Sequence, residues 1–373
     1  MTNQKERWVL QLCHGYASPF DDVARQWGSL FKGSGYKVLT VFLTGKPDER
    51  VKTLVGGDVV FFGYHSRDLK GLKRRQIKEI KSLHRQYQFS FAIAHRYKPI
   101  YIASHLPNLK VIGVSHAFGV YEPFFRRRYI MKKSDSLLLV GVSNAIRDDA
   151  RRALPNFPTE RIQTVYNHID CGKAAARLFT REEARNRLGL TEDDFVVGNV
   201  GRLHPDKDQA TLVEAFATVL GDVPQARLVI IGEGRLRTEL ECQIKELGIS
   251  DRVELKGRVE EAFRYFRAFD VFALSSDYEP FGMVLLEAMV APIPVVSTDS
   301  GGAPEVLGGD GRFFSVGDVD ALAEQLLQIS LESKECREAM ARTLLERLHT
   351  LFSDEAARKV FEQLLVSWNG QLG

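Results

Sequence analysis

The sequence contains no run of about 18 apolar residues, so no segment is predicted to span a membrane. Its four cysteines (Cys13, Cys171, Cys242 and Cys336) lie far apart, without the spacing of a metal or redox site. The N-terminal residues have no basic region followed by an apolar stretch, which is the pattern of a secretory signal. No low-complexity tract or short repeat occurs. We therefore expect a cytoplasmic protein with reduced thiols, and 373 residues are enough for two domains.

Charge is unevenly distributed along the chain. Residues 1–170 contain 28 Lys and Arg against 14 Asp and Glu, which leaves 23 against 34 for residues 171–373. A basic half is typical of a surface that meets an anionic partner. Two domains that simply differ in surface composition would give the same pattern.

Short apolar runs rich in β-branched residues alternate with helical stretches in both halves, which predicts βα units and parallel sheets. In the first half these runs are 8–12, 38–43, 59–62, 91–94, 111–114 and 137–142, with a further short strand at 164–165. In the second half they are 195–200, 227–231, 253–255, 271–274 and 293–297.

Two such series predict two doubly wound, Rossmann-like α/β domains in tandem. We place an N-terminal domain at 1–170 and a C-terminal domain at 171–352. Residues 353–373 are predicted to form a helix that packs back toward the N-terminal domain. Ligands bind beyond the carboxyl ends of the strands in such sheets, so a cleft between the domains is the expected location of the site.

The richest chemistry follows the strand at 195–200. Gly201 permits close approach of the backbone to a ligand, and Arg202 and Lys207 place two cations at a strand-to-helix turn. Cations at such a turn stabilise a leaving group that gains negative charge. A basic pair in a loop is also common as ordinary solvated surface.

A second turn follows the strand at 271–274. Pro280 and Gly282 indicate a turn, and a helix is predicted to begin near Gly282, which would direct backbone N–H groups toward an anion or a sugar hydroxyl. Glu279 lies in the turn. Glu287 lies in the helix among apolar residues, where paired ribose hydroxyls would satisfy its carboxylate. The alternatives are a surface Glu279 and a Glu287 paired with a nearby arginine.

Two glycine clusters complete the second half. Residues 231–234, Ile-Gly-Glu-Gly, are a weak dinucleotide fingerprint because a third glycine is missing. Residues 301–305, Gly-Gly-Ala-Pro-Glu, follow a strand, and these glycines are more simply explained by a tight turn.

The second half resembles family 4 of the retaining GT-B glycosyltransferases (group 1), particularly bacterial lipopolysaccharide-core and surface-polysaccharide members. The resemblance lies in the order and spacing of four motifs: residues 199–207, residues 231–234, the Glu279 and Glu287 pair, and residues 301–305. The resemblance implies a hexosyltransferase in which Arg202 and Lys207 bind the donor diphosphate and Glu287 binds the ribose. It further implies that the sugar is held by Glu279 and the backbone of residues 280–282 (Pro280, Phe281, Gly282). The backbone at Arg258 and Val259 would meet the base. By the same resemblance, the domain at 1–170 would be the acceptor side and the domain at 171–352 would bind the nucleotide-sugar.

The first half resembles the family more loosely, through residues 94–99 and 115–119. In that family a histidine at the end of this strand lies beside the donor sugar, which makes His116 the catalytic candidate together with Arg202, Lys207 and Glu279. A histidine simply packed at a strand end is the alternative. Gly15 is a candidate for donor-phosphate or acceptor contact, although the family commonly has two glycines in this loop.

We expect neither a metal nor a cofactor. The patterns Asp206-Lys207-Asp208 and Asp318-Val319-Asp320 could suggest a metal, but the first encloses the phosphate-binding lysine and the second is typical of a helix N-cap. Retention is implied by the resemblance. It is easiest to reconcile with a same-face substitution in which the leaving phosphate helps to deprotonate the acceptor.

Two basic segments bear on the acceptor. Residues 69–81 are predicted to form a helix with a cationic face, and residues 121–133 interleave aromatic and basic residues. Such segments favour docking on an anionic membrane, with a peripheral location on the cytoplasmic membrane and a lipid-linked acceptor. The resemblance to bacterial members implies a glycan or glycolipid acceptor such as lipopolysaccharide core. A solvated charged helix is the alternative for the first segment.

Two other functions fit parts of the sequence. A sugar-nucleotide epimerase of the same architecture would use the donor site without an acceptor. A nucleic-acid-binding protein would use the basic half, but no helix-turn-helix, zinc or RNA-binding pattern is present, so we expect no nucleic-acid partner.

Overall fold

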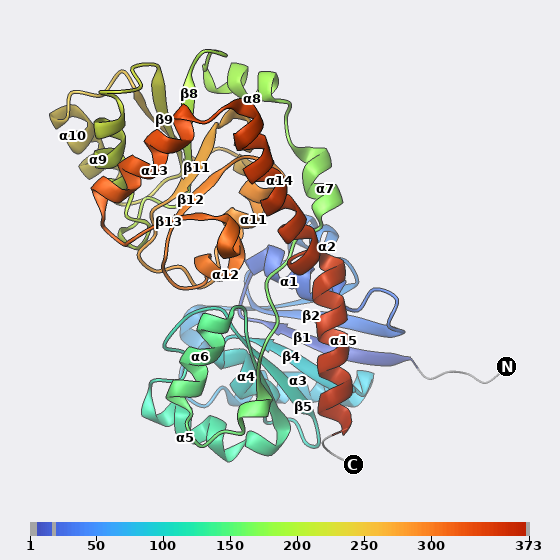
Figure 1. Cartoon of the computed structure of the whole chain (residues 1–373). Coiled ribbons are helices and arrows are strands. Elements are labelled where there is room, and N and C mark those ends of the chain that lie inside the picture. Colours follow the sequence, from blue (N-terminus) through green and yellow to red (C-terminus); the bar gives the residue numbers. More distant parts are fainter. Residues whose placement is uncertain (1–5, 17–19, 371–373) are drawn as a thin grey trace. The chain divides into compact units, whose positions relative to one another are not determined.

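The computed structural model describes residues 6–16 and 20–370. The chain divides into two compact units. The first comprises Met1–His168 together with Asp354–Gly373, and the second comprises Ile169–Ser353. Each unit contains one parallel β-sheet with helices alongside it (Figure 1).

In the first unit the strand order is β3-β2-β1-β4-β5-β6-β7, and each neighbouring pair is parallel. The order reverses between β1 and β4, the position where open α/β sheets bind ligands. The inner strands are buried, as their continuous apolar sequences predict. The strands are β1 Arg7–Cys13, β2 Tyr36–Thr44, β3 Asp58–Tyr64, β4 Phe91–His95, β5 Lys110–Ser115, β6 Leu137–Gly141 and β7 Ile162–Thr164.

The helices of this unit are α1 Phe20–Ser29, α2 Glu49–Val55, α3 Arg74–Tyr87, α4 Tyr97–Ala103, α5 Phe124–Lys132, α6 Asn144–Ala153 and α15 Asp354–Gly370. The prediction of one helix over residues 69–81 is wrong at its N-terminal end, because α3 begins only at Arg74. Gly71 and Lys73 both have positive φ, +63° and +51°, which interrupts the helical path, and Leu69 belongs to a separate short 3-10 turn.

In the second unit the strand order is β10-β9-β8-β11-β12-β13, again parallel throughout. The strands are β8 Phe195–Val200, β9 Ala226–Ile231, β10 Val253–Gly257, β11 Val271–Leu274, β12 Val295–Thr298 and β13 Arg312–Phe314. The helices are α7 Cys171–Arg177, α8 Arg181–Leu188, α9 Gln209–Val219, α10 Arg237–Glu246, α11 Met283–Val290, α12 Ala303–Leu307, α13 Val319–Leu331 and α14 Lys334–Leu351.

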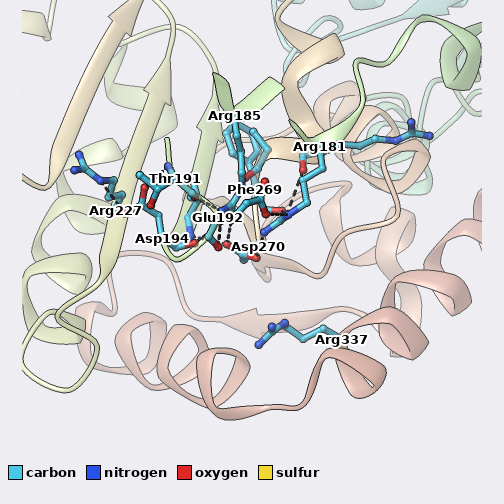
Figure 2. A network of polar contacts seen from close by, with 12 residues as sticks. Arg181, Arg185, Thr191, Glu192, Asp194, Arg227, Phe269, Asp270 and Arg337 are labelled. Carbon is cyan, nitrogen blue, oxygen red and sulfur yellow. Dashed lines mark hydrogen bonds and ion pairs between the residues drawn. The ribbon is translucent and has the colours of Figure 1, made fainter. Parts of the chain in front are cut away.

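A buried arginine organises the amino-terminal edge of the second sheet (Figure 2). The Arg185 guanidinium, on α8, donates hydrogen bonds to the carboxylate of Asp270 at 2.7 Å and to the carbonyls of Ala268 and Asp194 at 3.1 Å each. Asp270 and Asp194 directly precede β11 and β8. These contacts tie α8 to the segments that lead into β8 and β11.

The last helix, α15, completes the core of the first unit (Figure 1). Its Phe361 is buried and packs edge-to-face on Trp27 and Phe31, with ring centroids 5.8 and 5.4 Å apart. At its first turn, Asp354 lies 2.7 Å from the Nδ1 atom of buried His168. Among the described residues, no helix is both long and apolar enough to cross a bilayer.

Candidate active site

The turn after β8 carries the two predicted phosphate-binding cations. Lys207 ends a 3-10 turn, Pro205–Lys207, and its Nζ donates to the Glu279 carboxylate at 2.6 Å. The two side chains are only 18% and 9% exposed. Arg202 is 70% exposed and bonds to Asp206 at 3.3 Å. The structure thus joins Lys207 to Glu279 directly, and leaves Arg202 at the surface of the same turn.

Glu279 is held at both its backbone and its side chain. Its carbonyl accepts a hydrogen bond from the N–H of Gly302 at 2.8 Å, while its carboxylate binds Lys207. Gly301 has a φ of +60°, and a Cβ there would lie 2.0 Å from the Glu279 carbonyl oxygen. These glycines therefore permit the loop after β12 to pack against the loop after β11. This agrees with the prediction that the glycines of residues 301–305 form a tight turn.

The glycines after β9 have a similar packing role. A Cβ at Gly232 would lie 1.8 Å from the carbonyl oxygen of Gly201, and one at Gly234 would lie 2.1 Å from that of Leu203. The N–H of Leu203 donates to the Glu233 carbonyl at 3.0 Å. The two glycines therefore allow the segment after β9 to pack against the turn that carries Arg202. This packing explains the glycines without a role in dinucleotide binding.

Helix α11 begins directly after Gly282, as predicted. Gly282 adopts a φ of +97° and accepts a hydrogen bond from the Leu285 N–H at 2.9 Å. Phe281 is buried against Phe352, with ring centroids 5.8 Å apart, and Pro280 is half-buried, so this turn is firmly packed. Glu287 lies in the second turn of α11 and is half-buried.

Arg258 and Val259 directly follow β10, the former exposed and the latter half-buried. All the predicted donor-binding residues of the second unit therefore follow the carboxyl ends of its strands or lie in the helix after β11. This is where a parallel sheet binds ligands.

Both Asp-x-Asp patterns are used within the protein. Asp206 binds Arg202 and His204. Asp208 caps α9 by accepting from the Thr211 N–H at 3.4 Å, and it also accepts from the Thr211 hydroxyl at 2.6 Å. Asp318 caps α13 through the Ala321 N–H at 3.0 Å. In the part of the chain that the structure describes, no three His, Cys, Asp or Glu side chains are grouped as a metal site would require.

In the first unit His116 directly follows β5 and lines a pocket of about 290 Å³. The pocket is also lined by His14, Arg96, Lys98 and Arg126. Arg96 and Lys98 belong to the segment 94–99 and Arg126 to the basic segment 121–133, but they were not predicted to share a pocket with His116. Gly15 is adjacent to His14, and a Cβ there would lie 2.5 Å from Thr44 Oγ1, whose hydroxyl donates to the His14 carbonyl at 2.8 Å. Close packing of the loop against β2 thus explains this single glycine.

His116 is paired with a second histidine that sequence reasoning did not select. His95 Nδ1 and His116 Nε2 are 3.1 Å apart, and the His95 ring packs edge-to-face on Trp27. Burial, and then the nearby Arg96, lowers the pKa of His116 to about 3. Burial, and then His116, lowers the pKa of His95 well below its usual value. Both rings are therefore neutral at neutral pH.

The Nε2 atom of His95 is buried and has no hydrogen-bond partner, and this decides which ring nitrogen of each histidine carries the proton. If His116 donated the shared proton, His95 would carry its own proton on Nε2, as a buried N–H group without an acceptor. An unpaired buried N–H is rarer than an unpaired acceptor. The arrangement therefore favours donation from His95 Nδ1 to His116 Nε2, which leaves His116 with a proton on Nδ1.

Known proteins agree with this architecture. Residues 180–344 match the family model of glycosyl transferases group 1. The chain is 27% identical over 299 residues to N-acetyl-alpha-D-glucosaminyl L-malate synthase of Bacillus anthracis, covering 78% of this chain and 75% of that protein. It is 34% identical over 185 residues to the lipopolysaccharide core biosynthesis glycosyltransferase LpsE of Rhizobium meliloti, covering 49% of this chain and 53% of that protein.

Among solved structures, HepE of Anabaena in complex with UDP and glucose superposes with a TM-score of 0.80 at 20% identity, over 97% of this chain and all of that one. The two parallel sheets and this likeness confirm the predicted α/β, two-domain GT-B fold. The cleft between the domains stays a prediction, as do the roles of the individual site residues. The chain is a glycosyltransferase, with residues 180–344 similar to the group 1 family.

Proposed function

We propose that this glycosyltransferase moves a sugar, with retention and without a metal, from a nucleoside-diphosphate donor to a glycan or glycolipid. The observation that carries the proposal is the ion pair between half-buried Lys207 and buried Glu279 at the carboxyl edge of the second sheet. A paired cation there is fixed in position before the donor binds. The likeness to HepE, which was solved with UDP, supports a UDP-sugar as the donor.

In the proposed mechanism Arg202 and Lys207 bind the diphosphate. As the bond to the sugar breaks, negative charge grows on the leaving phosphate, and these two cations stabilise that charge. Glu287 accepts hydrogen bonds from the ribose hydroxyls, and the backbone at Arg258 and Val259 meets the base.

Glu279 and the backbone of residues 280–282 hold the transferred sugar. Because Lys207 already neutralises Glu279, this carboxylate is suited to accept hydrogen bonds from sugar hydroxyls rather than to attack the anomeric carbon. The leaving phosphate takes the proton of the acceptor hydroxyl, which attacks from the same face. The proposed part of His116 is hydrogen bonding to the sugar through its neutral ring.

The experiment that tests this proposal measures UDP release from UDP-sugars with and without added glycan or glycolipid acceptors, in the presence of EDTA. Acceptor-dependent UDP release that survives EDTA is the expected result. Conversion of the donor to a different UDP-sugar with no acceptor present would instead establish the rival epimerase activity. Loss of turnover in EDTA, restored by Mg²⁺, would contradict the metal-independent mechanism.

A membrane-linked acceptor is favoured by the surface of α5. Phe124 and Phe125 are 60% and 82% exposed, and the neighbouring Arg127 and Arg128 are exposed as well, whereas Arg126 lines the pocket of the first unit. Exposed aromatic rings beside arginines suit an anionic bilayer, at about 1 kcal/mol per basic residue near the surface. The basic segment 69–81 would add to this attraction. The similarity to LpsE supports lipopolysaccharide core as the acceptor.

Liposome flotation tests this docking. Phe125→Ser with Arg127→Ser and Arg128→Ser is expected to lower binding to anionic liposomes at least tenfold, while UDP affinity stays unchanged. Lys32→Ser with Arg85→Ser, two exposed cations outside both basic segments, is the control. Equal flotation of the α5 variant and the wild type would contradict the docking surface.

A further inference from the structure

The pocket of the first unit lies at the carboxyl ends of β1, β4 and β5, three neighbouring strands of the sheet. His14 follows β1, Arg96 and Lys98 follow β4, and His116 follows β5, while Arg126 reaches it from α5. Its volume of about 290 Å³ is near the lower limit for small-molecule sites. That volume suits a single sugar or acid unit rather than an extended oligosaccharide.

The charged groups that line this pocket are all cationic. Arg96, Lys98 and Arg126 contribute to the wall, and no Asp or Glu of the described chain does. Neither Lys98 nor Arg126 forms an ion pair with any carboxylate in the described part of the protein. Arg126 is instead oriented by the Val120 carbonyl, at 3.1 Å, and by the ring of Tyr97, whose centroid is 5.0 Å away.

The positive potential of the pocket lowers the pKa values of neighbouring basic groups. Burial lowers the pKa of His14, and Lys98 and Arg96 lower it further. Burial also lowers the pKa of Lys73, with Lys98 and Arg126 as the next causes. Like charges held close together repel one another, so an anion bound among these cations would be stabilised by each of them.

We infer that this pocket binds a phosphate or carboxylate group carried by the acceptor, so that the enzyme prefers an anionic acceptor. Arg96, Lys98 and Arg126 would hold the anion through charge-assisted hydrogen bonds. The inference rests on the proposed function, in which the donor diphosphate is bound by Arg202 and Lys207 of the second unit. The cations of the first unit are then available to the other substrate.

The pocket can be probed with three matched ligands that differ in charge: glucose 6-phosphate, glucuronate and glucose. Binding is measured by isothermal titration calorimetry on the full chain, with UDP at saturating concentration to occupy the donor site. The test variant is Lys98→Met with Arg126→Gln. The matched control, Lys32→Met with Arg85→Gln, removes the same charge from exposed positions of the same unit.

The wild type and the control are expected to bind glucose 6-phosphate or glucuronate at least tenfold more tightly than glucose, and the test variant is expected to lose that preference. The better of the two anions identifies phosphate or carboxylate as the group recognised. Equal affinity for glucose and both anions, or unchanged anion binding by the test variant, would overturn the inference. Single variants Lys98→Gln and Arg96→Gln, checked by circular dichroism, repeat the test should the double variant fail to fold.

Binding of UDP to the same proteins separates this inference from the proposed function. UDP affinity is expected to be equal in the wild type, the test variant and the control. A parallel loss of UDP and anion binding in the test variant would assign these cations to the donor and overturn the inference. A wild type that binds no UDP would contradict the proposed function itself.

Discussion

At the residue scale, the His95–His116 pair couples the first unit's pocket to its core. His95 is buried between His116 and Trp27, and both histidines are neutral because burial lowers their pKa values. A neutral His116 with its proton on Nδ1 can donate one hydrogen bond without bringing a further positive charge near the cations of the pocket. The orientation and the tautomer of the His116 ring thus depend on its hydrogen bond with His95.

This pairing predicts a pH dependence of stability. In the unfolded chain each histidine has a pKa of about 6.5, above its value in the folded protein. Below that pH the unfolded chain binds protons that the folded protein excludes, so the free energy of unfolding falls as the pH falls, by up to about 1.4 kcal/mol per pH unit for each histidine. The contribution is fully present above pH 7. Urea unfolding between pH 7.5 and 5.5 should show a shallower decline for His95→Asn than for the wild type, and parallel declines would contradict it.

Glu287 carries a second prediction at this scale. It is half-buried in α11, and the proposed role is to accept hydrogen bonds from the ribose. Loss of a protein carboxylate that accepts hydrogen bonds from a ligand lowers the binding free energy by about 1.5–3 kcal/mol. Glu287→Ala should therefore weaken UDP binding about 10- to 100-fold and abolish transfer. Titration with UDP checks the first effect. Wild-type turnover by the variant would remove Glu287 from the donor site.

At the element scale, the loops after β11 and β12 act as one structure because Gly301 and Gly302 let them touch. Gly301→Ala would place a methyl group 2.0 Å from the Glu279 carbonyl oxygen in a left-handed conformation. We expect a stability loss of about 1–3 kcal/mol and weaker donor binding, because Glu279 must move. Gly309→Ala is the matched control, since its Cβ would meet nothing within 4 Å. Equal urea midpoints and UDP affinities for the two variants would contradict this packing role.

Most elements could be predicted from the sequence because buried parallel strands are short, continuous apolar runs. All the predicted strands are present, but β13 was missed, since Arg312–Phe314 is too short to show a pattern. The predicted helix over 69–81 is too long because two residues near its start have positive φ. Gly71 is the visible signal for this break, whereas the positive φ of Lys73, a non-glycine residue, leaves none in the sequence.

The candidate site was predicted unevenly for a related reason. Lys207 and Glu279 were both named, yet their direct pairing joins residues 72 positions apart and depends on tertiary packing. His95 belongs to the segment 94–99 that carries the resemblance, but its contact with His116, 21 positions away, depends on the pairing of β4 with β5. The cations at Arg96, Lys98 and Arg126 converge only once β4 and α5 are folded.

At the scale of the whole molecule, the end of the chain stabilises the unit that contains its beginning. Phe361 of α15 fills the space beside Trp27 and Phe31. Phe361→Ala should lower the free energy of unfolding of the first unit by about 3–5 kcal/mol and leave the transition of the second unit in place. Val366→Ala, at an exposed position of the same helix, should change it by less than about 0.5 kcal/mol. Equal urea midpoints for the two variants would contradict the structural role of α15.

The account as a whole depends on the carboxyl edge of the second sheet being the donor diphosphate site. Calorimetric titration of UDP into the wild type, into Arg202→Met with Lys207→Met, and into Lys334→Met with Arg342→Met tests this directly, because both double variants remove two cations from the same unit. We predict wild-type affinity for the α14 control and at least 100-fold weaker binding for the variant at the site. UDP binding of equal strength in all three proteins would contradict the account.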